Sequence, residues 1–259
     1  MKRRISSTLM ALVLVFGLLP ATVFAAEGET TDPFASAKTI FVSKAGGGDG
    51  TEASPMTLPE AIKFINSYTP EDGEVAPAFI ISLTGESETL ECMFSDNDPA
   101  HILTLNKHAT RILGNGHSIE TNRTITTTGK GTRVDLGKPD GTDTLTINVG
   151  FDSAPTLAIY NGAEMHMYAG VTVNHVFKPE ENSGNEQSSN TFSDSAINLS
   201  GESNFYMHGG RVSNCATMKA TILVAESHVE IHGGTICDNT VWGKMLEVPS
   251  TYITSLLWL

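Results

Sequence analysis

The sequence predicts an all-β protein built as a solenoid of parallel strands, with three strands in each coil. Three observations support this prediction. Hydrophobic residues make up 40% of the 259 residues while only 17% are charged, and the 24 glycines accompany many Thr, Ser and Asn, as is typical of short strands and turns. Short apolar-alternating segments recur with one internal template. Glycine-containing corners separate these segments, because glycine accepts positive φ without steric cost.

One six-residue template occurs three times in the second half of the chain. The copies MHMYAG, FYMHGG and VEIHGG start at Met165, Phe205 and Val229. Equivalent positions in the last two copies, Met207 and Ile231, are 24 residues apart, whereas the first two copies are separated by 40 residues. The difference matches a polar stretch at 178–193, which we expect to be a loop inserted into one coil.

Apolar strands flank each copy of the template. The alignment pairs Ile159, Leu199 and Leu223 upstream, and Thr172, Val212 and Ile236 downstream, with Val173 able to replace Thr172 after a one-residue slip. A period near 24 residues predicts that each strand pairs with its counterpart one coil away, about 4.8 Å along the axis. Period-2 alternation then directs two columns inward. These columns are Met165, Phe205 and Val229, and Met167, Met207 and Ile231.

An antiparallel sandwich is the alternative fold, because alternating strands and glycine turns serve both architectures. Three copies in one register favour the solenoid. Upstream of the template, the chain contains further strand-like segments, at 79–83, 102–105, 111–119 and 145–149. Their sequences are too degenerate to predict registers.

A short helix is expected to close the N-terminal end, because an open coil exposes core residues and unpaired backbone groups. Thr57 and Glu60 have the spacing of a capping box, and Pro59 suits the first turn. The sequence therefore predicts a cap helix at about 57–67. Its apolar stripe consists of Ala61, Ile62, Phe64 and Ile65.

The first 25 residues have the features of a secretory signal peptide. Three basic residues at 2–4 precede an apolar run at 9–19, and Val23-Phe24-Ala25 resembles a cleavage site before Ala26. The alternative, a transmembrane anchor, needs about 20 apolar residues, which is more than this run provides. We therefore expect an extracellular or cell-surface location, with no membrane span after cleavage.

The remaining boundaries follow from the repeat. Residues 26–38 are expected to be a flexible linker, and 39–241 the solenoid domain. Residues 242–259 depart from the template and end in the apolar Ser-Leu-Leu-Trp-Leu. Two interpretations stay open for this end: the chain is a fragment of a longer protein, or the tail folds back over the last coil.

Three cysteines, Cys92, Cys215 and Cys237, are an odd number for an exported chain. In the repeat, Cys237 aligns with Ser213, two positions from Cys215. This offset predicts a Cα separation of about 8 Å between Cys215 and Cys237. Because disulfides rarely span more than about 7 Å, we expect free thiols.

Three stretches carry a resemblance to a known family. They are FVSKAGGGDGTEASPMTLPEAI at 41–62, MHGGRVSN at 207–214 and IHGGTICDN at 231–239. Together they resemble the pectin lyase-like superfamily, and most closely the adhesin-type surface proteins of Gram-positive bacteria. The resemblance implies a right-handed, single-stranded parallel β-helix. It does not imply one activity, because this fold hosts lyases, hydrolases, esterases and non-enzymatic surface proteins.

Charge and arginine content argue against two classes of function. The net charge of −13 opposes binding to a nucleic-acid backbone. The resemblance implies that a lyase would combine Ca²⁺-binding carboxylates with a basic Arg or Lys. The arginines that follow the signal peptide are Arg111, Arg123, Arg133 and Arg211, and no motif places one beside paired carboxylates on adjacent coils. Catalytic residues therefore remain unassigned.

The outward-facing positions of the repeat are the candidate binding site. If Met207 and Ile231 point inward, two stacked columns point outward. One column is Tyr168, His208 and His232, and the other is His166, Tyr206 and Glu230. Tyr and His rings can stack on sugars or make polar contacts, so we expect this strip to bind a polysaccharide or a host-surface glycan.

Metal ions are not required by this pattern. The stacked histidines lack a specified third ligand, so no metal site is assigned. Two acidic turns, at 96–98 and 140–143, offer oxygen atoms to Ca²⁺, although such turns are more often simply solvated. No cofactor is expected, with Ca²⁺ kept as an alternative.

The sequence thus predicts a secreted or cell-surface β-helix that is adhesin-like and binds glycans or surfaces without catalysis. Two alternatives stay open. One is a carbohydrate-active enzyme, either a polysaccharide lyase or a glycoside hydrolase. The other is a truncated structural fragment of a larger surface protein. The oligomeric state is not predicted.

Overall fold

The computed structural model describes residues 32–72, 75–86, 88–99, 101–149, 154–175 and 195–241. The predicted signal peptide at 1–25, the predicted inserted loop at 178–193 and the C-terminal segment 242–259 lie outside these residues, as do residues 26–31 of the predicted linker. From Ser36 onward the chain forms one unit. Within the described part of the chain, no helix is long and apolar enough to cross a membrane.

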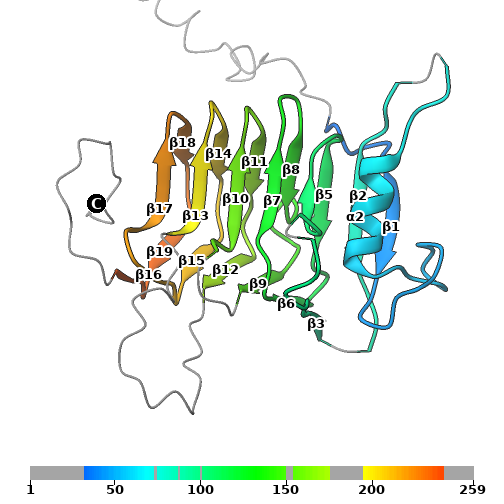
Figure 1. Cartoon of the computed structure of the whole chain (residues 1–259), viewed down its shortest axis with the longest axis horizontal. Coiled ribbons are helices and arrows are strands. Elements are labelled where there is room, and N and C mark those ends of the chain that lie inside the picture. Colours follow the sequence, from blue (N-terminus) through cyan, green and yellow to red (C-terminus); the bar gives the residue numbers. More distant parts are fainter. Residues whose placement is uncertain are drawn as a thin grey trace, which may run out of the picture. The chain divides into compact units, whose positions relative to one another are not determined.

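This unit consists of parallel strands stacked in sheets (Figure 1). The seven-stranded sheet contains, in spatial order, β1 (Lys38–Val42), β2 (Phe79–Leu83), β5 (Thr110–Leu113), β8 (Arg133–Leu136), β11 (Glu164–Met167), β14 (Asn204–Met207) and β18 (His228–Ile231). The five-stranded sheet contains β17 (Ala220–Ala225), β13 (Ser195–Ser200), β10 (Leu157–Tyr160), β7 (Ile125–Thr128) and β4 (Thr104–Leu105).

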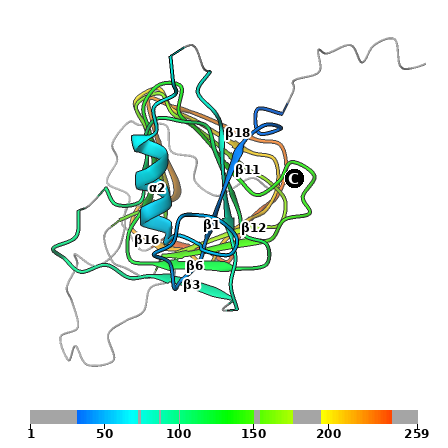
Figure 2. The same ribbon diagram turned by 90° about the vertical axis from the view of Figure 1, so that its right-hand side faces the viewer.

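The six-stranded sheet contains β19 (Thr235–Cys237), β15 (Arg211–Ser213), β12 (Val171–His175), β9 (Leu145–Val149), β6 (Ser118–Thr121) and β3 (Thr89–Cys92). A small sheet pairs β16 (Ala216–Thr217) with β20 (Thr240–Val241). Consecutive strands such as β10, β11 and β12 belong to different sheets, and each pairs in parallel with strands far away in the sequence. Figure 2 shows β1, β11 and β18 along one side and β3, β6 and β12 along another. This is the arrangement of a parallel β solenoid.

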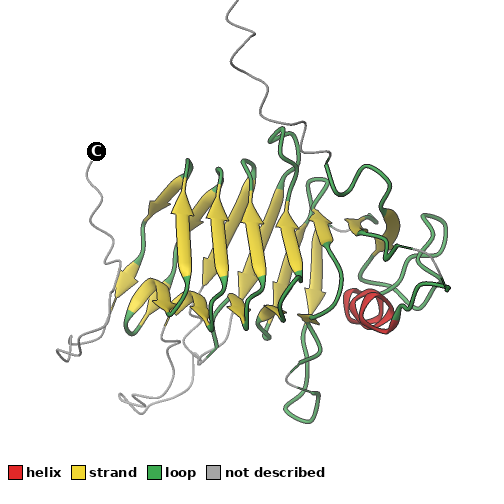
Figure 3. Ribbon diagram, turned by 90° about the horizontal axis from the view of Figure 1, so that it is seen from above, coloured by secondary structure: helices red, strands yellow, loops and turns green. Residues whose placement is uncertain are grey.

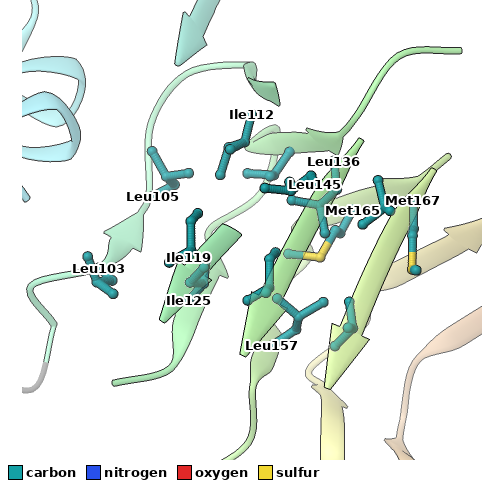
Figure 4. Packing of buried hydrophobic residues seen from close by; sticks show 14 of the residues in the cluster. Leu103, Leu105, Ile112, Ile119, Ile125, Leu136, Leu145, Leu157, Met165 and Met167 are labelled. Atoms are coloured by element: carbon teal, nitrogen blue, oxygen red, sulfur yellow. The ribbon is translucent and has the colours of Figure 1, made fainter. Parts of the chain in front are cut away.

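The strand pairing confirms the predicted inward columns. Met165 pairs with Phe205, which pairs with Val229, and Met207 pairs with both Met167 and Ile231. Inward residues from the three large sheets meet in one core, as Figure 4 shows for Ile112, Leu136, Met165, Met167, Leu105, Ile125, Leu157, Ile119 and Leu145. Fully burying such a side chain contributes roughly 1.5–3 kcal/mol, so this column of apolar residues stabilises the stack.

Two details of the predicted register differ from the structure. Leu199 pairs with Val224, so the predicted pairing with Leu223 is wrong by one residue. The reason is the corner that follows: three residues connect β13 to β14, whereas two connect β17 to β18. Val173, and not Thr172, pairs with Val212, as the one-residue slip allowed.

The predicted helix is α2 (Leu58–Ser67), and its capping box is formed. The Glu60 backbone N–H donates to Thr57 Oγ1 at 3.4 Å, and the Thr57 backbone N–H donates to Glu60 Oε2 at 2.8 Å. The buried face consists of Leu58, Ala61, Ile62 and Ile65. Phe64, which was expected in the buried stripe, is 40% exposed because it lies beside this face rather than on it.

Helix α2 covers the edge of the five-stranded sheet (Figure 3). Strand β4 is the last strand of that sheet, so one side of its backbone lacks a strand partner. The Asn66 side chain occupies this side: its Nδ2 donates to Thr104 O at 2.6 Å, and its Oδ1 accepts from the Asn106 N–H at 3.2 Å. A side-chain amide thus replaces a neighbouring strand at this edge.

All three cysteines are free thiols, as predicted. Burial raises the pKa of Cys92 to about 11 and that of Cys215 to about 12. We therefore expect iodoacetamide to modify Cys237 in the native protein at least about tenfold faster than the buried pair, because the thiolate is the reactive form. Mass spectrometry of the alkylated protein, with and without urea, measures this difference. A linked 215/237 peptide in the unreduced protein would contradict the free-thiol assignment.

Candidate functional site

The structure brings all six predicted binding residues together on the outer face of the seven-stranded sheet. His166, Tyr206 and Glu230 are register partners on β11, β14 and β18. Tyr168, His208 and His232 each follow the last residue of one of these strands. We call the five rings the ring ladder: His166, Tyr168, Tyr206, His208 and His232.

The rings of the ladder stack on one another. The His166 and Tyr206 centroids are 4.7 Å apart, and those of His208 and His232 are 5.4 Å apart. Tyr168 lies 5.0 Å from His208, and the planes of these three pairs differ by 23°, 6° and 12°. Parallel strands impose this order, because equivalent outward side chains repeat once per strand spacing. Since the rings cover one another's faces, ligand contacts must come mainly from ring edges.

Exposure increases along the ladder toward β18. Tyr168 is buried, and the His166 side chain is only 11% exposed. His208 is exposed, and the His232 side chain is 55% exposed. A ligand on this face would therefore meet His208, His232 and the half-exposed Glu230 before the inner rings.

Two glutamates hold the imidazoles in place. Glu230 contacts His228 Nε2 at 2.8 Å and His232 Nε2 at 2.9 Å. Hydrogen bonds from His228, and also from His232, lower the pKa of Glu230. On β11, Glu164 Oε1 contacts His166 Nε2 at 2.5 Å, and His166 Nδ1 lies 2.9 Å from His208 Nε2. One ring of the His166–His208 pair must be the acceptor in this contact.

Desolvation and neighbouring charges shift the pKa values of three ladder groups: His208, Tyr168 and Tyr206. The neighbouring rings shield one side of the exposed His208 from water, and this partial desolvation lowers its pKa; positive charge on His166 or His232 lowers the pKa further. Burial raises the pKa of both Tyr168 and Tyr206, and neighbouring carboxylates add to the rise. The phenols therefore stay protonated at physiological pH and can donate hydrogen bonds.

A charged cluster adjoins the buried end of the ladder. Asp135 on β8 is fully buried, with Arg111 Nη2 at 3.0 Å from Oδ2 and Arg133 Nε at 2.7 Å from Oδ1. The Tyr168 hydroxyl donates to Asp135 Oδ2 at 3.4 Å, and Arg133 Nη1 lies 3.6 Å from Glu164. Burial lowers the pKa of Arg133, but its hydrogen bond and charge interaction with Asp135 outweigh this and raise it.

No sequence motif indicated an arginine beside paired carboxylates on adjacent coils, whereas the structure places Arg111 and Arg133 against Asp135. Arg111 and Asp135 are register partners on β5 and β8, and Asp135 is the register partner of His166 on β11. The 24-residue spacing of Arg111 and Asp135 equals the repeat period and could have revealed this contact. Because Asp135 is enclosed and paired with two guanidinium groups, the cluster fits a structural role better than acid or base chemistry.

The structure also shows an open groove that sequence reasoning missed. It has a volume of about 1140 Å³ and lies on the outer side of the five-stranded sheet. Its lining is rich in hydroxyl and amide groups, including Thr104, Thr126, Thr128, Tyr160, Asn122 and Asn161, with Asp96, His101 and Arg123 as the ionisable groups. These residues come from separate strands and loops, so no local sequence motif indicates the groove.

The described residues contain no group of three or more His, Cys, Asp and Glu side chains that could hold a metal ion. In the two acidic turns, carboxylates accept local hydrogen bonds: Asp98 from the Ser95 N–H at 2.7 Å, and Asp140 from the Thr142 N–H at 2.9 Å. Such bonds are typical of solvated turns. The hydrogen bonds to Thr142 lower the pKa of Asp140.

Together, the fold and this surface define an all-β protein of stacked parallel strands that carries a ladder of imidazole and phenol rings on one sheet. Comparison of the chain with protein-family models, curated proteins and solved structures found no match.

Proposed function

We propose that this chain is a secreted or cell-surface protein, adhesin-like and non-catalytic, that binds a glycan through the ring ladder. Its scaffold is a right-handed parallel β-helix with three strands per coil, as the pectin lyase-like resemblance implies. The observation that carries the proposal is the ladder itself. Stacked rings come from three neighbouring strands, and His208 and His232 at the β14 and β18 end expose their polar edges.

The chemistry of the strip suits sugar hydroxyl groups. Imidazole nitrogen atoms and phenol hydroxyls donate or accept hydrogen bonds, and the carboxylate of Glu230 accepts them. The rings are held by stacking and by glutamate contacts, so less side-chain freedom is lost on binding. A polymer lying along the stack would meet one set of these groups per coil.

A glycan array tests this proposal on the folded chain from Ala26 onward, with and without Ca²⁺. We expect saturable binding that falls at least about tenfold in the His208→Ala/His232→Ala variant, because two exposed ring edges are lost. The matched control is Tyr160→Ala, which removes a ring from the groove on another sheet. If Tyr160→Ala abolishes binding and the double variant does not, the groove is the binding site. Binding to no glycan would contradict the proposal.

The enzyme alternative makes a different prediction for the same polysaccharides. A lyase would create unsaturated chain ends, and a hydrolase would create new reducing ends. Appearance of either product would replace the binding proposal with the carbohydrate-active enzyme. Retention without cleavage supports the binder, and a coding frame that continues past Leu259 would support the structural fragment.

A further inference from the structure

We propose that protonation gates the ring ladder, so that it holds a polysaccharide bearing carboxylate or sulfate groups at mildly acidic pH and releases it near neutrality. This inference rests on the proposed glycan-binding function and adds the ligand's charge and the condition of release. The inference is based on the arrangement of imidazole, carboxylate and guanidinium groups, which alternate across the outer face of the seven-stranded sheet.

The charged and titratable groups that face the ladder come from five neighbouring strands. They are Arg111 from β5, Arg133 and Asp135 from β8, Glu164 and His166 with Tyr168 from β11, Tyr206 with His208 from β14, and His228 and Glu230 with His232 from β18. With neutral imidazoles, two guanidinium groups face three carboxylates. Protonation of His166, His228 and His232 changes the net charge of this set from −1 to +2.

The imidazoles of this face differ in their nearest contacts. His166 lies against Glu164, and both His228 and His232 lie against Glu230, so a proton on any of these rings meets a carboxylate. The nearest ring-nitrogen contact of His208 is His166 at 2.9 Å. If both rings were doubly protonated, two N–H groups would face each other across this distance. The contact with His166 therefore disfavours a second ring proton on His208.

The stability of the ladder depends on the protonation state of His208. The pKa of His208 lies below its ordinary value in the folded protein because of burial and the neighbouring imidazoles. Its neutral form therefore favours the folded ladder, and this contribution is present above pH 6.5 and lost as the pH falls through the lowered pKa.

The new charge appears where a ligand can reach it. The His228 and His232 side chains are 57% and 55% exposed. The chain as a whole carries a net charge of −13, so an anionic polymer is repelled at neutral pH. After protonation the strip becomes a local positive surface on an acidic protein, because histidine is the side chain that titrates in this range.

Binding of the full chain to immobilised dextran, carboxymethyl dextran and dextran sulfate tests the proposal at pH 5.0 and pH 7.5 and one ionic strength. These polymers share a backbone and differ in charge, and the two charged forms separate carboxylate from sulfate recognition. We expect about tenfold tighter binding of at least one charged polymer at pH 5.0, equivalent to about 1.4 kcal/mol, and no pH effect with dextran. Added salt should weaken the acidic-pH binding.

Three variants locate the effect. The His166→Gln/His228→Gln/His232→Gln variant should lose the pH dependence, whereas His101→Gln, which removes an exposed imidazole from the groove, should keep it. Glu230→Gln should strengthen acidic-pH binding, because it removes a negative charge from the strip. Circular dichroism at both pH values checks that each variant is folded.

Each outcome bears on one claim. Equal affinity for a charged polymer at both pH values, or no binding of any of the three polymers, overturns proton gating. Binding of plain dextran, or of array glycans, without pH dependence supports the proposed function while overturning the gate. Loss of the pH effect in His101→Gln but not in the triple variant would show that the pH-sensitive group lies outside the ring ladder. That result overturns the assignment of the pH effect to the ladder.

Discussion

Replacement of Asp135 by asparagine is expected to lower the free energy of unfolding by about 3–5 kcal/mol. This carboxylate is fully buried and pairs with Arg111 and Arg133 on the same face of the sheet. Asparagine keeps the size but removes the carboxylate charge that lies 3.0 Å from the buried Arg111 guanidinium. Urea unfolding followed by circular dichroism measures the loss.

Two further variants separate charge pairing from general sensitivity of the chain. Asp96→Asn alters an exposed turn and should change stability by less than about 0.5 kcal/mol. The double variant Arg111→Met/Asp135→Leu removes a buried pair together, so it should be more stable than Asp135→Leu alone. A loss below about 1 kcal/mol for Asp135→Asn would show that the two guanidinium groups do not depend on this carboxylate.

The repeat explains why so much of the fold could be predicted. A solenoid repeats its contacts at a fixed period, so aligning Met207 with Ile231 also aligns their neighbours on both sides. The inward columns and the outward ladder follow from strand alternation once that register is known. The capping box at Thr57 was equally local, because both partners lie within one helical turn.

The parts that the sequence did not predict depend on contacts without a local signal. The Leu223 register was wrong because one corner is a residue shorter than its counterpart. Arg111 and Asp135 were not connected because their coils have lost the template, although the period persists. The predicted site also assumed open ring faces, whereas strand spacing stacks the rings against each other.

Truncation of Met207 to alanine is expected to be as severe as the loss of Asp135. Its side chain is fully buried between the equivalent positions of the neighbouring strands, Met167 and Ile231. Methionine-to-alanine changes at such sites cost about 2–5 kcal/mol, since buried contacts are lost and a cavity remains. The same urea titration measures the effect, and hydrogen exchange shows whether β14 opens before the strands around it.

Ile231→Ala is the matched control, because Ile231 occupies the same inward column one coil further along. It is 41% exposed, so less apolar surface returns to water, and we expect a loss of about 1 kcal/mol or less. In a stack whose strands contact only their neighbours, the cost of a truncation depends on how completely the adjacent coils cover the residue. Equal losses for Met207→Ala and Ile231→Ala would mean that Ile231 is covered in solution as fully as Met207, and would contradict the exposed position described for β18.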